Sequence, residues 1–93
     1  MIATIRHKGL RHLYERGETH GVSGDQIKRL RRILILLDNA ASLDDLDAMP
    51  GMRLHPKTGD LKGMWSLSVT GNWRVVFRFD DGDVNDVDLL DYH

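Results

Sequence analysis

The sequence predicts an α+β fold, in which two to three helices pack on one face of a mostly antiparallel sheet of about four to five strands. Apolar residues recur at helical spacing in the first half of the chain and alternate with polar residues in the second half. An Asp-Gly pair between the last two alternating runs is a strong signal for a tight hairpin turn. The 93 residues contain no internal repeat or linker, so we expect a single domain spanning residues 1–93.

Residues 1–6 are predicted to form a short strand at the start of the sheet, with their two isoleucines as packing residues. A short helix should follow, because Leu10, Leu13 and Tyr14 lie three and four positions apart. Gly17 suits the end of that helix, since glycine readily adopts the left-handed conformation that closes many helices.

A longer helix is predicted from about Gly24 to Asp38. Ser23 and Gln26 match the capping-box pattern, in which two polar side chains satisfy free N–H groups at a helix start. The apolar side chains at helical spacing are Ile27, Leu30, Leu34 and Leu37. The other sides of the helix carry a basic cluster of Lys28, Arg29, Arg31 and Arg32. This cluster is either the solvated side of an amphipathic helix, the commoner case, or a patch that faces phosphates.

A third helix of about two turns should begin at Ser42, since Ser42 and Asp45 again match a capping box, and end at Pro50–Gly51. Met52–His55 then has the pattern of a strand that enters the main sheet. We expect Pro56 to end this strand because proline has no N–H to donate. A loop rich in turn residues follows.

Residues 63–79 form the stretch around which the rest of the chain is arranged. Two alternating runs joined by a turn predict a hairpin with an apolar face of Trp65, Leu67, Val69, Trp73, Val75, Phe77 and Phe79. Its second face carries Ser66, Ser68, Arg74, Val76 and Arg78. Two guanidinium groups on a stiff scaffold are suited to binding a phosphate chain. After the Asp81–Gly82 turn, Val84–Leu90 is predicted to be the last, antiparallel strand.

Composition and charge restrict the class of protein. The chain has no cysteine, hence no disulfide framework and no thiolate nucleophile. Arg6 and Lys8 interrupt the only apolar run near the start, so we expect no signal peptide, and Ile33–Leu37 is too short to cross a bilayer. These observations predict a soluble protein of the cytoplasm with no membrane partner.

The net charge of −1 conceals a strong asymmetry. Up to Leu36 there are eight lysines and arginines against three acids, whereas the remainder has five basic residues against eleven aspartates. A chain polarised in this way can meet a polyanion on one side, or simply present two solvated faces of opposite sign.

Five histidines are candidates for acid–base chemistry. His55 is predicted at a strand end and His93 in the tail, where catalytic groups are often displayed. The other three, His7, His12 and His20, have no partner at useful spacing and are interpreted as surface or packing residues. A metal site is the competing hypothesis, but the chain has no HExxH motif and no histidines at i, i+4, so we expect no metal or other cofactor.

Several spaced motifs in this chain resemble those of the HigB toxins of the RelE-like superfamily. They are Arg6-His7-Lys8-Gly9-Leu10, Leu54-His55-Pro56 with a following Gly59-Asp60, Gly63-x-Trp65-Ser66, Asn72-Trp73-Arg74 and Asp91-Tyr92-His93. The resemblance covers essentially the whole chain and implies the RelE-like microbial-ribonuclease fold. It also implies a ribosome-dependent endonuclease that cuts mRNA in the ribosomal A site, inhibits translation and is held inactive by a HigA-type helix-turn-helix antitoxin. Association with DNA would be indirect, through the antitoxin.

The resemblance assigns catalytic roles to His55, Asp91, Tyr92 and His93, with Arg74 as a contact to the scissile phosphate. The family commonly has a lysine immediately before the Gly-Asp pair. Here Thr58 occupies that place, and Lys57, one residue earlier, is the expected phosphate or RNA contact.

These roles imply a metal-independent mechanism. The ribose 2′-hydroxyl of RNA is tethered beside the phosphate it attacks, which removes much of the entropic barrier. His55 and His93 would act as base and acid, Asp91 would orient one of them, and Arg74 would stabilise the charge of the transition state. Two alternatives remain: a non-catalytic RNA- or ribosome-binding module that uses the basic face, and a scaffold that binds an acidic chain through the Lys28–Arg32 cluster.

Overall fold

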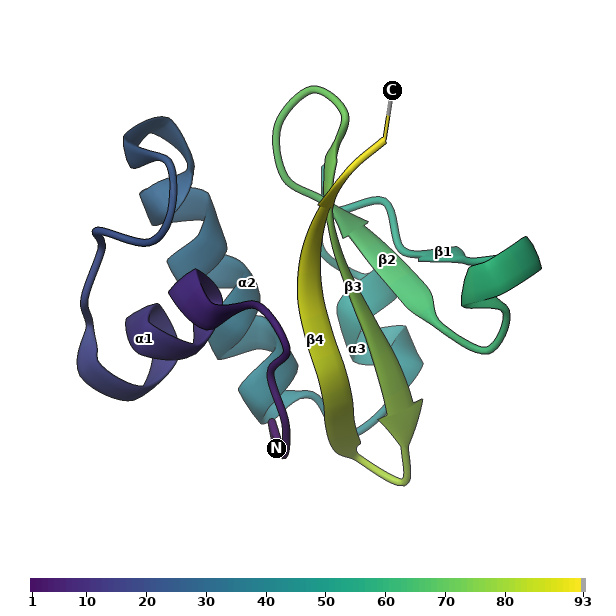
Figure 1. Ribbon diagram of the computed structural model, residues 1–93. Helices are drawn as coiled ribbons and strands as arrows, with labels where there is room; N and C mark the ends of the chain where they lie inside the picture. The colour runs from purple at the N-terminus through teal and green to yellow at the C-terminus, as the bar shows by residue number, and fades with distance from the viewer. Residues whose placement is uncertain (93) are drawn as a thin grey trace.

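The structure is a computed structural model that describes residues 1–92. Within that range the helices are α1 (Lys8–Arg16), the 3₁₀ turn η1 (Gly24–Gln26), α2 (Ile27–Asn39), α3 (Leu43–Asp47) and the 3₁₀ turn η2 (Gly59–Leu61). The strands are β1 (His55–Pro56), β2 (Trp65–Ser68), β3 (Trp73–Asp80) and β4 (Asp83–Asp91). They form one antiparallel sheet in the order β1-β2-β3-β4, which confirms the predicted α+β class (Figure 1).

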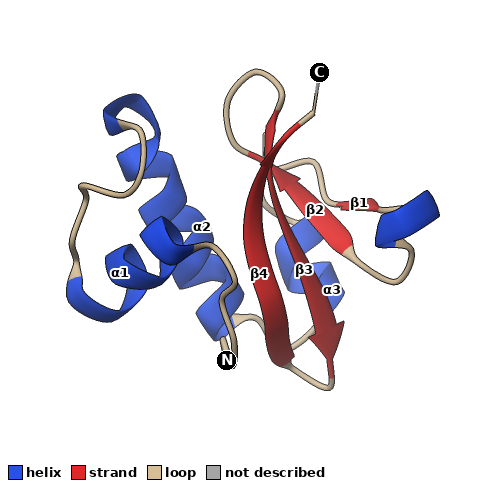
Figure 2. Ribbon diagram, viewed as in Figure 1, coloured by secondary structure: helices blue, strands red, loops and turns tan. Residues whose placement is uncertain are grey.

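The core lies between the helices and one face of the sheet. Figure 2 shows α1 and α2 gathered on one side of the strands. The register places Leu67 opposite Val75 and Val75 opposite Leu89, and all three side chains are buried in the core with Phe77. The predicted alternation is confirmed, because Ser66, Arg74 and Val76 occupy the intervening positions and belong to the opposite face. That opposite face is the one available for function.

Two of the predicted helix ends are confirmed. Gly17 has φ +70° and its N–H donates to the carbonyl oxygens of His12 and Leu13, which closes α1 in the left-handed conformation. At the start of α3, the Asp45 carboxylate accepts hydrogen bonds from the N–H groups of Ala41 and Ser42. The helix itself is shorter than the predicted two turns, with five residues.

The predicted capping box at Ser23 is wrong. The Ser23 hydroxyl donates to Asp25, and a 3₁₀ turn precedes α2 instead of a capped helix start. The Gln26 side chain, only 3% exposed, turns inward and donates through Nε2 to Thr70 Oγ1 at 2.9 Å. A buried amide must be hydrogen-bonded, so the contact with the β2–β3 turn takes precedence over local capping.

The predicted N-terminal strand is reduced to two isolated bridges with β4. Ile2 pairs with Val84 and Ile5 with Val87, both in parallel orientation. Between them β4 has a bulge, where the register shifts and Asp86 adopts φ +56°. The bulge interrupts regular pairing and leaves the first residues outside the strands of the sheet.

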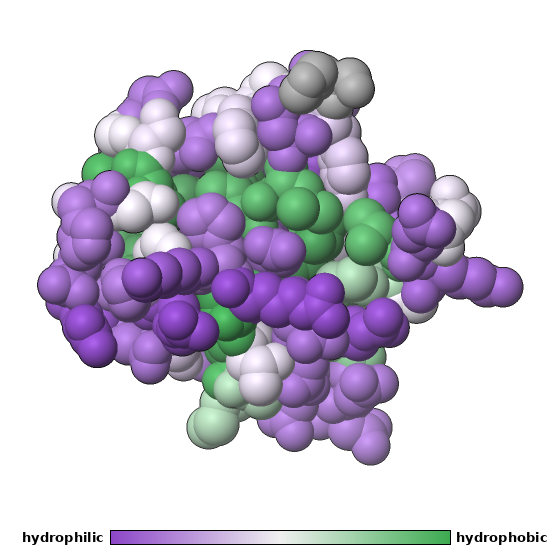
Figure 3. Space-filling view, in the orientation of Figure 1, coloured by the Kyte–Doolittle hydropathy of each residue, from purple (hydrophilic) through white to green (hydrophobic). Residues whose placement is uncertain are grey.

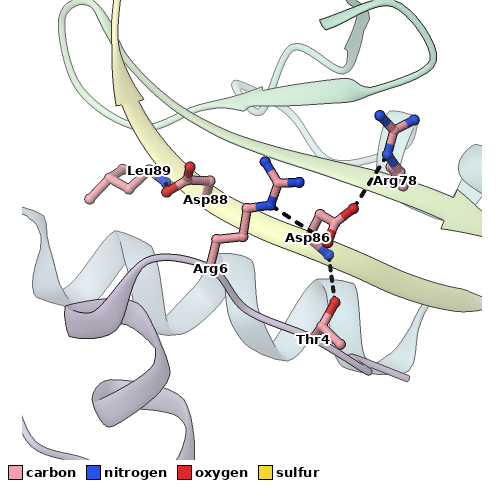
Figure 4. A network of polar contacts seen from close by, with 6 residues as sticks. All are labelled: Thr4, Arg6, Arg78, Asp86, Asp88 and Leu89. Carbon is pink, nitrogen blue, oxygen red and sulfur yellow. Dashed lines mark hydrogen bonds and ion pairs between the residues drawn. The ribbon is translucent and has the colours of Figure 1, made fainter.

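Asp86 is the centre of a polar network at this bulge (Figure 4). Its carboxylate lies 3.6 Å from Nε of Arg6 and 3.4 Å from Nε of Arg78, and its N–H donates to Thr4 Oγ1 at 2.8 Å. Both ion pairs are partly exposed, so each contributes at most about 1 kcal/mol to stability. Their main effect is to hold the N-terminal segment against β4 and β3.

The strand predicted at Met52–His55 is displaced toward the C-terminus. Arg53 adopts φ +51°, which breaks the extended conformation, and β1 comprises only His55 and Pro56. Pro56 is the last residue of this strand and itself pairs with Trp65. This is tolerated because β1 is an edge strand, where a missing N–H leaves no neighbour unsatisfied.

The surface seen in Figure 3 is mostly hydrophilic, with apolar atoms visible in a band between the helical layer and the sheet. A few large apolar side chains are exposed, of which Ile35 on α2 is the most solvent-accessible after Met1. Among residues 1–92, no helix has both the length and the apolar character needed to cross a bilayer.

Asp38 provides a test of how the N-terminal segment is held. Its Oδ1 accepts hydrogen bonds from the N–H of Ile2 and the hydroxyl of Tyr14, both at 2.9 Å. The hydrogen bond from Ile2 lowers the pKa of Asp38 below its usual 3.8. Partial burial opposes this shift, whereas the Tyr14 hydrogen bond and the charge of the terminal ammonium add to it. The stability from Asp38 is therefore present above pH 3.8 and is lost as the pH falls through the lower, folded-state pKa.

We expect Asp38→Asn to make the free energy of unfolding less dependent on pH below pH 3.8, because asparagine keeps an acceptor but does not titrate. Urea unfolding at a series of pH values measures this slope. The exposed Asp47→Asn is the matched control. An Asp38→Asn slope equal to that of the wild type would contradict the role assigned to Ile2 and Tyr14.

Candidate active site

A cavity of about 370 Å³ opens on the face of the sheet opposite the helices. The residues that line it are Arg53, His55, Lys57, Ser66, Ser68, Arg74 and Tyr92. They come from β1 and its flanking segments, from β2, from β3 and from the residue after β4. Four of them, His55, Lys57, Arg74 and Tyr92, are among the residues that the sequence singled out.

Sheet register brings these distant residues together. His55 pairs with Ser66, Ser68 pairs with Arg74, and Arg74 pairs with Leu90. Residues directly opposite in neighbouring strands project on the same face, so β1 to β4 each add a side chain to one surface. Ser66 forms the buried floor, only 3% exposed, and its hydroxyl donates to the His55 carbonyl at 3.5 Å.

The β2–β3 turn holds two of the site residues. Nη1 of Arg74 donates to the carbonyl oxygens of Gly71 at 2.8 Å and Trp73 at 2.9 Å. The N–H of Tyr92 donates to the carbonyl oxygen of Asn72 at 2.8 Å, which attaches the end of the chain to the same turn. Main-chain carbonyls hold Arg74, and within residues 1–92 no carboxylate forms an ion pair with it, so these contacts leave its positive charge in place.

Lys57 and Tyr92 contact each other across the cavity. Nζ of Lys57 lies 4.2 Å from the centre of the Tyr92 ring, within the range of a cation–π interaction. The Tyr92 hydroxyl is buried and has no hydrogen-bond partner among the described residues. Burial raises the pKa of Tyr92 above 10.0, the charge of Asp88 adds to this, and Arg74 opposes it. At neutral pH the phenol therefore remains protonated and can donate.

The cavity is electropositive. Arg53, Lys57 and Arg74 line it together with His55, and the described lining contains no carboxylate. The partly exposed Asp88 belongs to the same face, opposite Val76, and acts on Tyr92 through its charge. Such a surface can hold a phosphate group between cations while a neutral hydroxyl and an imidazole stand beside it.

One predicted site residue among those described does not line the cavity. Asp91 is exposed at the end of β4, opposite Trp73, and is not part of the cavity lining. Alternation places it on the face opposite that of Arg74, although it makes an interaction of its own. His93 lies outside the described residues.

Sequence reasoning missed Arg53, Asp88 and the bracing role of Arg29. Arg29 belongs to the predicted basic cluster, but its guanidinium turns inward and bonds the carbonyl oxygens of Ser68 at 3.1 Å and Gly51 at 2.7 Å. Nothing in helical spacing distinguishes it from the exposed Lys28, Arg31 and Arg32. Ser66 and Ser68 were placed on the correct face but not assigned to a site.

No group of three or more metal-ligating side chains suited to a metal ion occurs within residues 1–92. The three histidines interpreted as surface or packing residues lie in the helical layer. His7 accepts a hydrogen bond from the N–H of Leu10 at the start of α1, and the rings of His12 and His20 lie 5.8 Å apart.

Comparison with known proteins identifies the family. Residues 3–93 match the family described as the RelE-like toxin of the type II toxin–antitoxin system HigB. The chain belongs to the HigB toxin family. The resemblance found in its motifs is thereby confirmed.

Two curated relatives support this assignment. The chain is 39% identical over 93 residues to the endoribonuclease HigB of Proteus vulgaris, and the alignment covers 100% of both. It is 34% identical over 83 residues to the toxin HigB-1 of Vibrio cholerae, which covers 88% of this chain and 87% of the relative.

A solved structure confirms the fold of this HigB-family chain. The crystal structure of YafQ from Escherichia coli strain BL21(DE3) superimposes with a TM-score of 0.57 and 17% sequence identity. The match covers 98% of this chain and 91% of YafQ. At this level of identity the similarity concerns the fold alone.

The raised pKa of Tyr92 can be tested by alkaline titration. We expect its phenol to lose its proton only above pH 10.0, because burial disfavours the phenolate. Since Tyr14 also has a raised pKa, from burial and the neighbouring Asp38, the absorbance of Tyr92→Phe is subtracted from that of the wild type. A difference titration with a midpoint at or below 10.0 would show that the hydroxyl is not shielded in solution.

Proposed function

We propose that this chain is an endoribonuclease toxin of a type II toxin–antitoxin system, which cuts mRNA in the ribosomal A site and thereby inhibits translation. The observation that carries the proposal is the electropositive cavity, in which His55, Lys57, Arg74 and Tyr92 meet from three separate segments of the chain. The full-length similarity to a relative named endoribonuclease supports it.

The proposed reaction is attack of the ribose 2′-hydroxyl on the adjacent phosphate. The nucleophile is already tethered to its target, so the protein must supply a base, an acid and positive charge, and no metal is required for this chemistry. The oxygen–phosphorus bond to the 2′-oxygen forms as the bond to the departing 5′-oxygen breaks. The products are a 2′,3′-cyclic phosphate and a 5′-hydroxyl.

Each residue has a proposed role. His55, exposed at the cavity rim, exchanges a proton with the 2′-hydroxyl or the 5′-oxygen, and His93 takes the complementary step. Arg74 stabilises the charge that builds up on the phosphorane, since both of its bonds to carbonyls use only Nη1. Asp91 orients one of the histidines.

Lys57 and Tyr92 bind the RNA in this proposal. Lys57 supplies a second cation for the phosphate chain, held in place by its contact with the Tyr92 ring. The buried hydroxyl of Tyr92, without a partner among the described residues, donates to a phosphate or base of the substrate. Substrate would then satisfy a donor that the cavity leaves unpaired.

The proposed partners are a HigA-type helix-turn-helix antitoxin, the ribosome and mRNA, in the cytoplasm. Any association with DNA would pass through the antitoxin. The second candidate is a non-catalytic RNA- or ribosome-binding module, favoured by the three cations of the cavity, which would bind phosphates with or without cleavage.

The end chemistry of the product tests the mechanism. We expect purified protein and programmed ribosomes to yield fragments with 2′,3′-cyclic phosphate and 5′-hydroxyl ends, at a rate that EDTA does not change while the ribosomes remain intact. Mapping the cut position and both ends by primer extension and ligation measures this. Fragments with 5′-phosphate ends would contradict 2′-hydroxyl attack.

Histidine substitutions separate the enzyme from the binding module. We expect His55→Ala and His93→Ala to slow cleavage about a hundred- to ten-thousand-fold, because each removes one proton-transfer group. RNA affinity and the melting temperature should change little. His20→Ala, in the helical layer, is the matched control. Wild-type turnover by either variant would remove that histidine from the site, and absence of cleavage by the wild type would favour the binding module.

A further inference from the structure

Arg53 is a cation of the cavity that lies outside the motifs singled out in the sequence. It lies two residues before His55 and lines the same hollow as Lys57 and Arg74. Its side chain is exposed and takes part in no hydrogen bond or ion pair among the described residues. Its guanidinium is therefore free to bind an anion in the cavity.

The backbone at Arg53 is strained in a way that favours a functional role. Its φ of +51° lies in the left-handed region, which arginine adopts at a cost and glycine adopts freely. Backbone outliers of this kind persist where surrounding contacts enforce them, and they cluster at functional sites. A glycine would meet the demands of the turn here, but would display no cation.

Three hydrogen bonds enforce this conformation. The N–H of Ser68 donates to the carbonyl oxygen of Met52 at 2.7 Å, which fixes the residue before Arg53 to the end of β2. Arg29 bridges the same two segments, from Nε to the carbonyl oxygen of Ser68 and from Nη2 to that of Gly51. The buried side chain of Met52 anchors the segment in the core.

We propose that Arg53 is a further RNA-contacting residue of this cavity, where it binds the RNA phosphate next to the scissile one. In this proposal Arg29 is the positioning residue that holds the segment of Arg53. The inference rests on the proposed function and deepens it. Arg53 extends the row of cations formed by Arg74 and Lys57 to the segment that leads into β1. A planar guanidinium suits a phosphate because it can donate two parallel hydrogen bonds.

Substitutions at position 53 separate the cation from the fold. Arg53→Gly removes the side chain and also relaxes the left-handed backbone, so its melting temperature should equal or exceed that of the wild type. We expect Arg53→Gly and Arg53→Ala to lower kcat/KM for ribosome-bound mRNA roughly ten- to a hundredfold, as for loss of a charged hydrogen bond. Arg53→Lys should recover part of the loss, since it keeps the charge but not the bidentate geometry.

A second readout reports RNA contact directly. Affinity for an RNA oligonucleotide blocked by 2′-O-methyl groups is measured against salt concentration, and loss of one phosphate contact should reduce the slope by about 1. The exposed Arg11→Ala on α1 is the matched control for loss of one arginine. Its slope and cleavage rate should equal those of the wild type.

The role of Arg29 is tested by a double-mutant cycle. We expect Arg29→Lys to lower cleavage in the wild-type background and to add little in the Arg53→Ala background, because it acts through Arg53. Fully additive losses would overturn the positioning role.

Cleavage and RNA affinity of Arg53→Gly both equal to those of the wild type would overturn the contact. If the wild type does not cleave but Arg53→Gly binds RNA with a smaller salt slope, the contact stands and the proposed enzymatic function fails. If the wild type neither binds nor cleaves RNA, both proposals are wrong.

Discussion

The antiparallel register of β3 with β2 and β4 is the constraint on which the rest of the structure depends. It assigns Val75 and Phe77 to the core and Arg74 to the opposite face. Because side chains alternate with a period of two, a shift by one residue would bury Arg74 and expose Phe77. The hydrophobic gain from burying Phe77, about 2–3 kcal/mol, and the cost of burying an unpaired guanidinium act in the same direction. The position of Arg74 is thus decided by the packing of the core.

Four cations of the molecule are held in two different ways. Arg6 and Arg78 share the carboxylate of Asp86, which reduces their net charge at the bulge (Figure 4). Arg74 is held by main-chain carbonyls and Lys57 by an aromatic ring, and neither contact removes charge. A dipolar or aromatic partner orients a cation without neutralising it, so the cavity stays available to a polyanion.

Similarity to YafQ at 17% identity shows that this fold tolerates extensive change in sequence, whereas function resides in the site. In this chain the cavity combines residues close in sequence, such as His55 and Lys57, with residues that the sheet brings from distant parts of the chain. The motifs around His55, Arg74 and Tyr92 were visible in the sequence, and the structure brings these three into one cavity. The catalytic and RNA-binding roles assigned to these three residues, and to Lys57, Asp91 and His93, stay predictions.

The sequence by itself determined the features that arise from local periodicity. Alternation in residues 65–79, the Asp81–Gly82 turn and the glycine that closes α1 each follow from the conformational preferences of neighbouring residues. Tertiary structure decided the rest. The buried side chain of Gln26 bonds Thr70, because buried polar groups must find partners wherever the chain brings them. The partly buried Arg29 bonds the carbonyl oxygen of Ser68 and so holds the segment of Arg53. Those partners are about 40 residues away, at separations of 44 and 39, and no local pattern encodes them.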